Sequence, residues 1–364
     1  MFGYLNGEPN LTHPLDIHTI FIELTNKCNF RCNFCPIDRT NRAPGEMDFT
    51  LFKRVIDEIA DTRISGRIAF HLLGEPLMAE NIYRAIEYVK SRGLEAALCT
   101  NGSLLTPDVT RQIINAHPDT LSISLETTDA GEHSSRGSVV KFEDYYAAIL
   151  DALALMHGNA RFPVTLTLMN TSSRKFFDLD GTIGVNVRET RFREKLVSLA
   201  GDVRRTLHEE HDAGRVDRLL RKLYLNRSRN LWINDRIKIY IQLIADWGNA
   251  FTAKKIHPVR IGCCGYTLNR IGVLQDGRVT LCCVDYDGKT SIGNVNDSPL
   301  NEILRSNLAH EIREGYKRNR VVHPHCRVCM GDPSRVKAAI KGLLSIYLFK
   351  LRAHPLDAAD VRLW

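Results

Sequence analysis

The sequence predicts an α/β fold: a partial (β/α)6 barrel followed by a small, cysteine-rich C-terminal domain. Two observations carry this prediction. Six short, nearly continuous apolar runs are typical of buried strands, and helical periodicity fills the gaps between them. Regular alternation of strand and helix indicates parallel βα units. The strands are expected at residues 18–24, 67–72, 94–99, 120–125, 163–169 and 237–243.

The helices between these strands are predicted from apolar residues spaced three and four apart. Such stripes occur at Leu51, Val55, Ile56 and Ile59, at Ile82, Ala85, Ile86 and Val89, and at Tyr145, Ile149, Ala152 and Leu153. Thr106-Pro107 marks a helix start, because threonine caps a first turn in which proline is tolerated. Sites in such sheets lie at the carboxyl ends of the strands, so chemistry is expected there.

Two segments interrupt the alternation. Residues 171–235 are rich in Arg, Glu, Asp and Leu and are expected to form a charged helical insert, and after Trp247 turns and cysteines dominate. This divides the chain into a barrel at 1–245, an auxiliary domain at 246–334 and a basic amphipathic tail at 335–364. The tail is apolar at Val336, Ile340, Leu343, Leu344, Tyr347 and Leu351. It is expected to pack on the protein with its lysines in water, and peripheral membrane contact is the alternative.

Composition narrows the class of protein. The 364 residues are 44% hydrophobic and 25% charged, so the chain can build a sizeable core and disorder over most of its length is excluded. A net charge of +7 permits an acidic partner without requiring one. Ten cysteines, with no secretory signal and no membrane-spanning apolar run, indicate a reducing, cytoplasmic setting. Cysteines there more often bind metals or do chemistry than form disulfides.

Three cysteines follow the first predicted strand directly, in the spacing C-x3-C-x2-C: Cys28, Cys32 and Cys35. Three thiolates on one loop can hold three corners of a four-iron cluster and leave the fourth iron open to a non-protein ligand. A zinc site with a fourth ligand from elsewhere is the alternative. The position at the end of a strand favours an active site over structural zinc.

The segment from Ile22 to Pro36 resembles the radical S-adenosylmethionine (SAM) enzymes, with Phe34 at the family's aromatic position before the third cysteine. The resemblance implies a partial (β/α)6 barrel and a three-cysteine 4Fe–4S cluster whose open iron is chelated by SAM. It further implies reductive cleavage of SAM to methionine and a 5′-deoxyadenosyl radical, which abstracts hydrogen from the substrate. A reducing electron donor such as a flavodoxin or ferredoxin is implied as well.

Further segments resemble the family's SAM-binding elements, which extend the implied cofactor-binding residues. Gly74-Glu75-Pro76 follows the second strand, where a carbonyl and a carboxylate would accept hydrogen bonds from the SAM ammonium. Asn101 lies in a Thr-Asn-Gly turn after the third strand. Ser124 and Glu126 lie where the family places ribose and methionine contacts, Glu126 replacing the usual aspartate. The Arg136 guanidinium would face the SAM carboxylate, and for Ser124 and Arg136 a purely structural role stays open.

A second set of cysteines occupies the C-terminal third: Cys263-Cys264, Cys282-Cys283, Cys326 and Cys329. Gly277 and Cys282 form a G-x4-C element, and a predicted hairpin around Gln275-Asp276-Gly277 would bring Cys264 and Cys282 together. The segment resembles the SPASM or twitch extension of radical SAM enzymes. This implies one auxiliary 4Fe–4S cluster on Cys264, Cys282, Cys326 and Cys329. Cys263 in place of Cys264, Cys283 in place of Cys282, and a four-cysteine zinc ribbon are the alternatives.

An auxiliary cluster suits net oxidation, in which a substrate loses a hydrogen atom, a proton and an electron. Dehydrogenation of a sugar or aminocyclitol alcohol is therefore expected, with Asp285 as candidate base. Alternatively, Cys283, Cys99 or Cys263 would return a hydrogen atom in an epimerase, or the chain modifies peptides. No leader-binding domain fits before the first strand, which favours a small substrate, although the insert could hold a peptide or carrier. A zinc protein that binds RNA is a third reading, and no nucleic-acid partner is expected.

Overall fold

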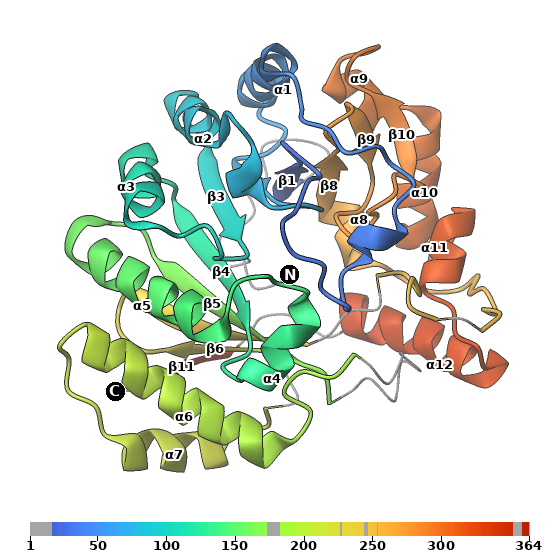
Figure 1. Cartoon of the computed structure of the whole chain (residues 1–364). Helices are drawn as coiled ribbons and strands as arrows, with labels where there is room; N and C mark the ends of the chain where they lie inside the picture. The colour runs from blue at the N-terminus through green and yellow to red at the C-terminus, as the bar shows by residue number, and fades with distance from the viewer. Residues whose placement is uncertain are drawn as a thin grey trace.

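The structure, a computed structural model, describes residues 17–172, 183–225, 228–243, 247–252, 254–351 and 359–363. Its strands join in one sheet of the order β10-β9-β8-β1-β2-β3-β4-β5-β7-β6-β11 (Figure 1). Six of them are the predicted strands, and they lie side by side and parallel: β1 (Thr19–Ile22), β2 (Arg67–Phe70), β3 (Glu95–Thr100), β4 (Thr120–Glu126), β5 (Val164–Asn170) and β7 (Ile237–Leu243). The partial-barrel fold is therefore confirmed.

The C-terminal strands extend the same sheet beyond β1. β8 (Arg270–Val273) pairs in parallel with β1, and Ile22 lies opposite Val273. β9 (Arg278–Thr280) and β10 (Ser291–Asn294) then add in antiparallel fashion, which confirms the hairpin predicted around Gly277. At the opposite edge lie two strands that were not predicted. β6 (Arg229–Trp232) runs antiparallel to β7, and β11 (Ala359–Arg362) pairs in parallel with β6.

Helices cover the outer side of the sheet, and Figure 1 shows them following one another around the strands. The Asp48 carboxylate caps α1 by accepting from the N–H groups of Thr50 and Leu51, and Thr106 caps α3 as predicted. The helices before the C-terminal region are α1 (Phe49–Thr62), α2 (Ile82–Ser91), α3 (Pro107–Ala116), α4 (Ala130–His133), α5 (Phe142–Asn159), α6 (Glu189–Thr206) and α7 (Ala213–Arg221). The helices of the C-terminal region itself are α8 (Gly265–Asn269), α9 (Leu300–Leu304), α10 (Asn307–Lys317), α11 (Pro324–Cys329) and α12 (Arg335–Ile346). Short turns of helix occur at η1 (Pro36–Arg39), η2 (Pro76–Met78), η3 (Ser134–Arg136) and the π-helical η4 (Tyr347–Leu351).

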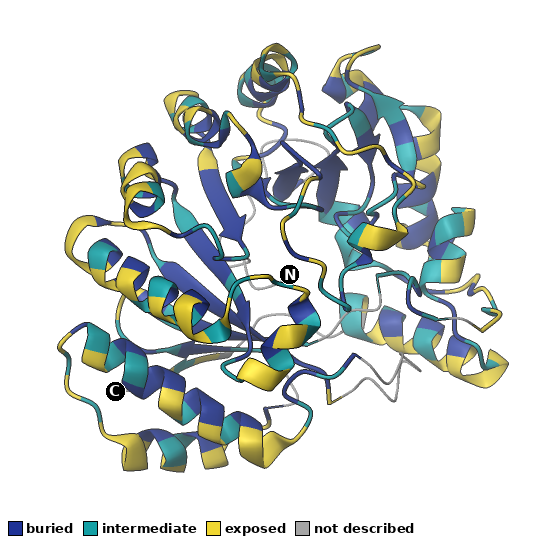
Figure 2. Ribbon diagram, in the orientation of Figure 1, coloured by how far each residue is buried: buried dark blue, intermediate teal, exposed yellow. Residues whose placement is uncertain are grey.

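The core lies between the strands and the inner sides of these helices, and Figure 2 shows buried strands under helices that expose only their outer sides. Phe52, Val55, Ile56 and Ile59 of α1 are all buried, as the apolar spacing predicts. A smaller apolar cluster lies on the inner side of the sheet and contains Phe21, Ala69, Leu72, Ala97, Leu274 and Cys283. These side chains therefore fill one level of the inner side of the sheet, and a cavity lies beyond them at the carboxyl ends of the strands.

The insert and the tail differ in how well the sequence predicted them. The insert contains the helices α6 and α7, as expected, while its residues 173–182 and 226–227 lie outside the described ranges. The tail does form a helix, α12, but its orientation was predicted wrongly. Its small residues Ala338, Gly342 and Ser345 face the protein, and the apolar stripe from Val336 to Tyr347 is exposed. The side chain of Leu351 and residues 352–358 are not among those described.

Candidate active site

A cavity of about 130 Å³ lies at the carboxyl ends of the parallel strands. Its lining comes from the loop after β1 and from the ends of β2, β3, β4, β5 and β7. The cavity brings together most of the site residues expected from the sequence: Cys28, Cys32, Phe34, Cys35, Gly74, Asn101, Ser124, Glu126 and Arg136. These residues are spread over 109 positions of the chain, so the fold collects them by bringing the strand ends to one edge.

The three-cysteine loop is held by backbone contacts. The Phe30 N–H lies 3.4 Å from Cys28 Sγ, and the Cys35 N–H donates to the Cys32 carbonyl at 2.9 Å. The N–H of Arg31 donates to the carbonyl of Arg136, at 3.0 Å. The loop is thereby fastened to the turn at η3.

The chemistry of this donor set fits an iron–sulfur cluster. Burial raises the pKa of the Cys28, Cys32 and Cys35 thiols above the ordinary value, so they ionise readily only beside a compensating cation such as iron. Among the described residues, no three His, Cys, Asp or Glu side chains converge tightly enough to share one metal ion. A cluster spreads its cysteines over different irons, whereas zinc gathers all its ligands at about 2.0–2.3 Å. Three buried thiols on one loop at this cavity fit three corners of such a cluster.

Gly74 and Glu75 position the cavity wall. Gly74 has a φ of +85°, and a Cβ there would lie 2.5 Å from the Thr25 carbonyl oxygen, so glycine lets the two loops touch. The Glu75 carboxylate is buried and accepts hydrogen bonds from the Thr100 hydroxyl at 2.7 Å and the Asn101 N–H at 2.6 Å. It therefore joins the loop after β2 to the turn after β3. Its contact with SAM stays a prediction, since the donors Leu77, Thr100 and Asn101 leave one accepting site of the carboxylate open.

Asn101, Ser124, Glu126 and Arg136 all present polar groups to the cavity. The amide of Asn101 lies 3.8 Å from Cys28 Sγ, and the Ser124 hydroxyl lies 3.7 Å from Cys99 Sγ. Glu126 has a φ of +66°, and its Oε2 is buried without a hydrogen-bond partner. Burial raises the pKa of this carboxyl, although the nearby Arg136 guanidinium opposes the shift. An unsatisfied buried carboxylate oxygen beside a cavity indicates a group kept for a ligand.

Arg136 lies under the cysteine loop. Its Nη1 donates to the Leu125 carbonyl at 3.1 Å and to the Tyr145 hydroxyl at 2.7 Å, and the guanidinium stacks 4.5 Å from the centre of the Phe30 ring. Burial raises the pKa of the Cys32 thiol, and the charge of the nearby Arg136 opposes this rise. Arg136 thus places a permanent positive charge against one of the three cysteines, which offsets the negative charge of a bound cluster.

A second, smaller cavity collects the auxiliary cysteines. Its lining includes Cys264, Cys282, Cys326 and Cys329, and burial raises the pKa of Cys326 to about 11. Cys263 is turned away: it is buried, and its N–H donates to the Ser345 hydroxyl of α12 at 3.0 Å. The geometry therefore selects Cys264 over Cys263. Val284 lines both this cavity and the larger one, so the two cavities are neighbours.

Of the residues expected to transfer a proton or a hydrogen atom, Asp285 and Cys283 do not line the larger cavity. The Asp285 carboxylate accepts from the N–H groups of Lys289 and Thr290 and from the Thr290 hydroxyl at 2.7 Å, and it lines the smaller cavity. It holds a turn and does not face the larger cavity. Cys283 lies in the inner apolar cluster, where burial raises the pKa of its thiol and the charge of the nearby Arg270 opposes this rise. Cys99, by contrast, lines the larger cavity directly.

The inner wall of the larger cavity contains polar groups that sequence reasoning missed. They are the hydroxyls of Thr165, Thr167 and Tyr240, the amide of Gln242 and the imidazole of His71, and they line the cavity together with the Ser122 hydroxyl. Ser122 and Thr167 are hydrogen-bonded to each other at 3.1 Å, whereas His71 Nε2 is buried without a partner. Burial lowers the pKa of His71 to about 3, so the imidazole is neutral at physiological pH. The signal for four of them was a pair of polar groups two positions apart in a strand, Thr165 and Thr167 in β5 and Tyr240 and Gln242 in β7, which the interpretation as fully apolar strands hid.

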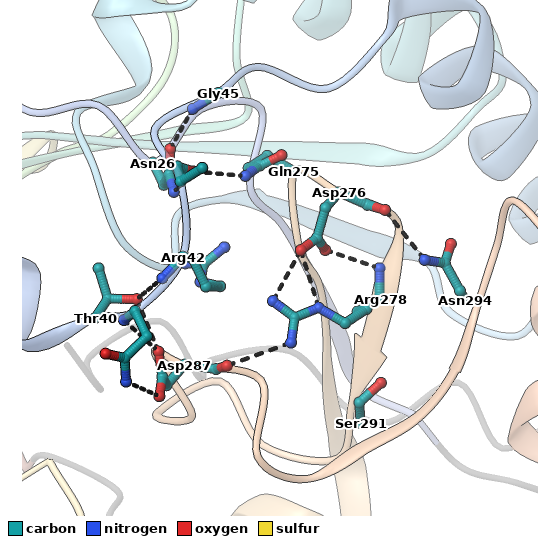
Figure 3. Close-up of polar contacts among 12 residues, drawn as sticks. Asn26, Thr40, Arg42, Gly45, Gln275, Asp276, Arg278, Asp287, Ser291 and Asn294 are labelled. Atoms are coloured by element: carbon teal, nitrogen blue, oxygen red, sulfur yellow. Dashed lines mark hydrogen bonds and ion pairs between the residues drawn. The ribbon is translucent and has the colours of Figure 1, made fainter.

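The loop between η1 and α1 is tied to the C-terminal hairpin. Figure 3 shows Asp287 accepting from Thr40, whose hydroxyl lies 3.0 Å away, and Gln275 reaching back toward this loop. Beneath these contacts the Arg42 guanidinium pairs with both oxygens of Glu23, at 2.5 and 2.8 Å, and both side chains are almost completely buried. Glu23 directly follows β1, so one ion pair links the end of the strand before the cysteines to the loop after them.

Comparison with known proteins supports iron–sulfur binding at both cavities. Residues 22–173 match the model of the radical SAM superfamily, and residues 263–330 match the SPASM iron–sulfur cluster-binding domain. An AdoMet-dependent heme synthase of Methanosarcina barkeri is 35% identical over 129 residues, which is 35% of this chain and 36% of that protein. An S-adenosyl-L-methionine-dependent 2-deoxy-scyllo-inosamine dehydrogenase of Niallia circulans is 34% identical over 93 residues, 24% of this chain and 36% of that one. The matches thus span about a third of the length of these curated relatives.

The crystal structure of Streptococcus suis SuiB bound to the precursor peptide SuiA has the same fold. It aligns with a TM-score of 0.55 at 11% identity, over 86% of this chain and 72% of that one. Radical SAM and SPASM domains imply the cofactors expected above, SAM with its 4Fe–4S cluster and auxiliary iron–sulfur binding. On the two domain matches, the chain carries a radical SAM domain followed by a C-terminal SPASM domain.

Proposed function

We propose that this enzyme is an oxidoreductase that dehydrogenates an alcohol of a small sugar or aminocyclitol, with an auxiliary cluster as electron acceptor. The observation that carries the proposal is the pair of neighbouring cavities that share Val284 in their lining. The first is lined by the three cysteines of the loop after β1, by Cys99 and by a polar inner wall, and the second is lined by four cysteines. A substrate in the first cavity lies close to an electron acceptor in the second. The partial match to a 2-deoxy-scyllo-inosamine dehydrogenase supports the same class of substrate.

Each residue has a role that follows from its position. Cys28, Cys32 and Cys35 would hold the SAM-binding cluster, and Cys264, Cys282, Cys326 and Cys329 the auxiliary one. The first cluster with SAM supplies reductive cleavage and a radical that abstracts hydrogen. The Asn101 amide, the Glu126 carboxylate and the backbone at Gly74 would bind and orient SAM. A cytoplasmic location and a flavodoxin or ferredoxin donor are part of the same proposal.

The polar inner wall would bind the substrate. Hydroxyls of Thr165, Thr167 and Tyr240 and the amide of Gln242 can each donate to or accept from a ring hydroxyl. His71 Nε2 would accept a hydrogen bond from the alcohol of the substrate, because it is buried, lacks a partner and lines the cavity. The enclosed site of about 130 Å³ keeps water from the reacting carbon and suits a small ring better than a folded peptide.

The cofactor assignment is tested by iron and sulfide content on anaerobically purified protein. We expect about eight irons per chain, from two four-iron clusters. Replacing Cys28, Cys32 and Cys35 together by Ala should leave about four irons and abolish the formation of 5′-deoxyadenosine from SAM. Continued SAM cleavage by that variant would contradict the assignment.

The reaction is tested on a panel of aminocyclitols and sugars. A new carbonyl in the product supports dehydrogenation, and His71→Asn should retain SAM cleavage while losing carbonyl formation. Epimerisation is the second candidate, because the thiol of Cys99 lines the cavity and can return a hydrogen atom. It predicts one solvent deuterium at an inverted carbon and its loss in Cys99→Ser. Turnover of peptides alone would place the enzyme with the peptide-modifying members instead.

A further inference from the structure

Helix α12 exposes an apolar stripe that nothing in the active site requires. The stripe consists of Val336, Ile340, Leu343, Leu344 and Tyr347, with exposed fractions of 69%, 53%, 64%, 43% and 49%. Residues at these spacings lie on one side of a helix. Over the eleven steps from Val336 to Tyr347 the stripe is about 16 Å long. Large apolar residues gathered on one surface element, rather than scattered singly, mark an interaction site.

The opposite side of α12 is locked against the protein, so the stripe cannot turn inward. A Cβ on Gly342 would lie 2.3 Å from the Ile261 carbonyl oxygen, which shows how closely the backbones meet. The Ser345 hydroxyl accepts from the Cys263 N–H, and Lys341 pairs with the buried Asp332 at 2.7 Å. The hydroxyl of Ser334 caps the first turn. Helix orientation is therefore set by small residues and polar anchors, and the exposure is built into the fold.

The charges around the stripe identify the chemistry of its partner. The exposed charged residues of α12 and η4 are all basic: Arg335, Lys337 and Lys350. Arg335 and Lys337 are exposed at the first turn, on either side of Val336, and neither forms an ion pair with a described residue. A second copy of the chain would bring these like charges together, which disfavours self-association through the stripe. The partner must be both anionic and able to accept a convex row of aliphatic side chains.

We propose that α12 docks on an anionic lipid bilayer, with its stripe in the boundary between headgroups and acyl chains. Interfacial helices combine this kind of apolar face with Lys and Arg at its sides, and bury the apolar face about 5–10 Å deep. Tyr347 places an amphipathic ring at one end of the stripe, as interfacial residues do. No helix among the described residues is long and apolar enough to cross a bilayer, so the contact is peripheral. The proposal stands apart from the proposed reaction.

Docking is tested by sedimentation of the full-length holoenzyme with vesicles under anaerobic conditions. We expect binding to vesicles of phosphatidylcholine and phosphatidylglycerol in equal parts and little binding to phosphatidylcholine alone. The variant Ile340→Ser, Leu343→Ser, Leu344→Ser should bind about tenfold less, because its apolar contact is removed. Arg335→Glu with Lys337→Glu should also bind about tenfold less. Val139→Ser, at an exposed apolar residue elsewhere, is the matched control and should bind as the parent does.

Two further measurements keep the test decisive. Leu343→Trp should show a blue shift of its fluorescence on adding the anionic vesicles, because the side chain enters an apolar phase. Iron content and melting temperature should be unchanged in the serine variant, since the replaced residues are exposed. Failure of the parent to bind anionic vesicles at low salt overturns the proposal, as does equal binding by the serine variant. A dimer in solution that the serine variant dissociates would make the stripe a self-interface and also overturns it.

Discussion

Replacing Arg42 with Met tests whether its ion pair with Glu23 holds the first cysteine loop in place. Arg42 and Glu23 have side-chain exposed fractions of 3% and 0%. The substitution leaves the Glu23 carboxylate buried with only the N–H groups of Leu73 and Gln275 as donors, each at 3.2 Å. Breaking a buried pair on one side costs about 3–5 kcal/mol, because the remaining charge has lost its partner.

This loss of folding free energy should be measurable as a lower melting temperature. At about 2.1 cal/mol/K of unfolding entropy per residue, a chain of 364 residues loses about 1.3 °C for each kcal/mol. Arg42→Met should therefore melt about 4–7 °C lower in anaerobic calorimetry. Arg111→Met is the matched control, since Arg111 pairs with Asp108 on the surface, where both side chains are mostly exposed, and it should cost under about 1 kcal/mol.

The comparison of the two variants can refute the reasoning. Equal melting temperatures for Arg42→Met and Arg111→Met would show that the buried pair does not stabilise the loop. The double variant Arg42→Met with Glu23→Gln removes the uncompensated charge and should recover part of the loss. No recovery would mean that the cost lies in packing and not in the charge.

Three further predictions concern the two cavities. Cys264→Ser should lower the iron content by about four per chain, whereas Cys263→Ser should leave it unchanged, and the reverse result would exchange the two roles. Because burial lowers the pKa of His71 to about 3, the unfolded chain binds a proton that the folded chain does not between about pH 6.5 and 3. Stability should thus fall as the pH drops through this window, and His71→Asn should flatten the dependence of melting temperature on pH; an unchanged slope would contradict this. Gly74→Ala should reduce iron loading of the first site, because the added Cβ collides with the Thr25 carbonyl; full loading would show that the loops can separate.

The six parallel strands could be predicted because each is buried on both sides and therefore nearly continuous in apolar residues. β6 could not, since Arg229-Asn230-Leu231-Trp232 is short and half polar, and only its pairing with β7 makes it a strand. The same holds for β11, whose partner lies about 130 residues earlier in the chain. Edge strands depend on tertiary partners that a local pattern does not contain.

The tail shows a second limit of sequence reasoning. Periodicity locates an apolar stripe on a helix, but it does not say which side faces the protein. In α12 the packed side is chosen by Gly342, Ala338 and Ser345, whose small size allows close approach to the loop at Ile261. Small residues contribute little to an apolar pattern, so the sequence predicts that the larger apolar side chains face the protein, which is wrong here.

The two sets of cysteines could be predicted from their spacing in the sequence, whereas the polar residues proposed to contact the substrate could not. Local spacing identifies Cys28, Cys32 and Cys35 because one loop holds them all. Asp285 was chosen for its nearness in sequence to a cysteine, and the structure shows its carboxylate engaged in a turn. His71 was passed over because a single histidine after a strand has no pattern, and only the folded chain shows its unpartnered nitrogen.

Because β1 lies between β2 and β8, neither half of this protein is a self-sufficient unit. A chain cut near residue 246 would leave the backbone donors and acceptors along one flank of β1 bare, which is a template for pairing with other molecules. Separate expression of the two segments should yield aggregates, while co-expression could restore the missing ladder. The barrel and the auxiliary region are thus joined by the pairing of β1 with β8. A truncation that removes one cluster site should therefore also unfold the other.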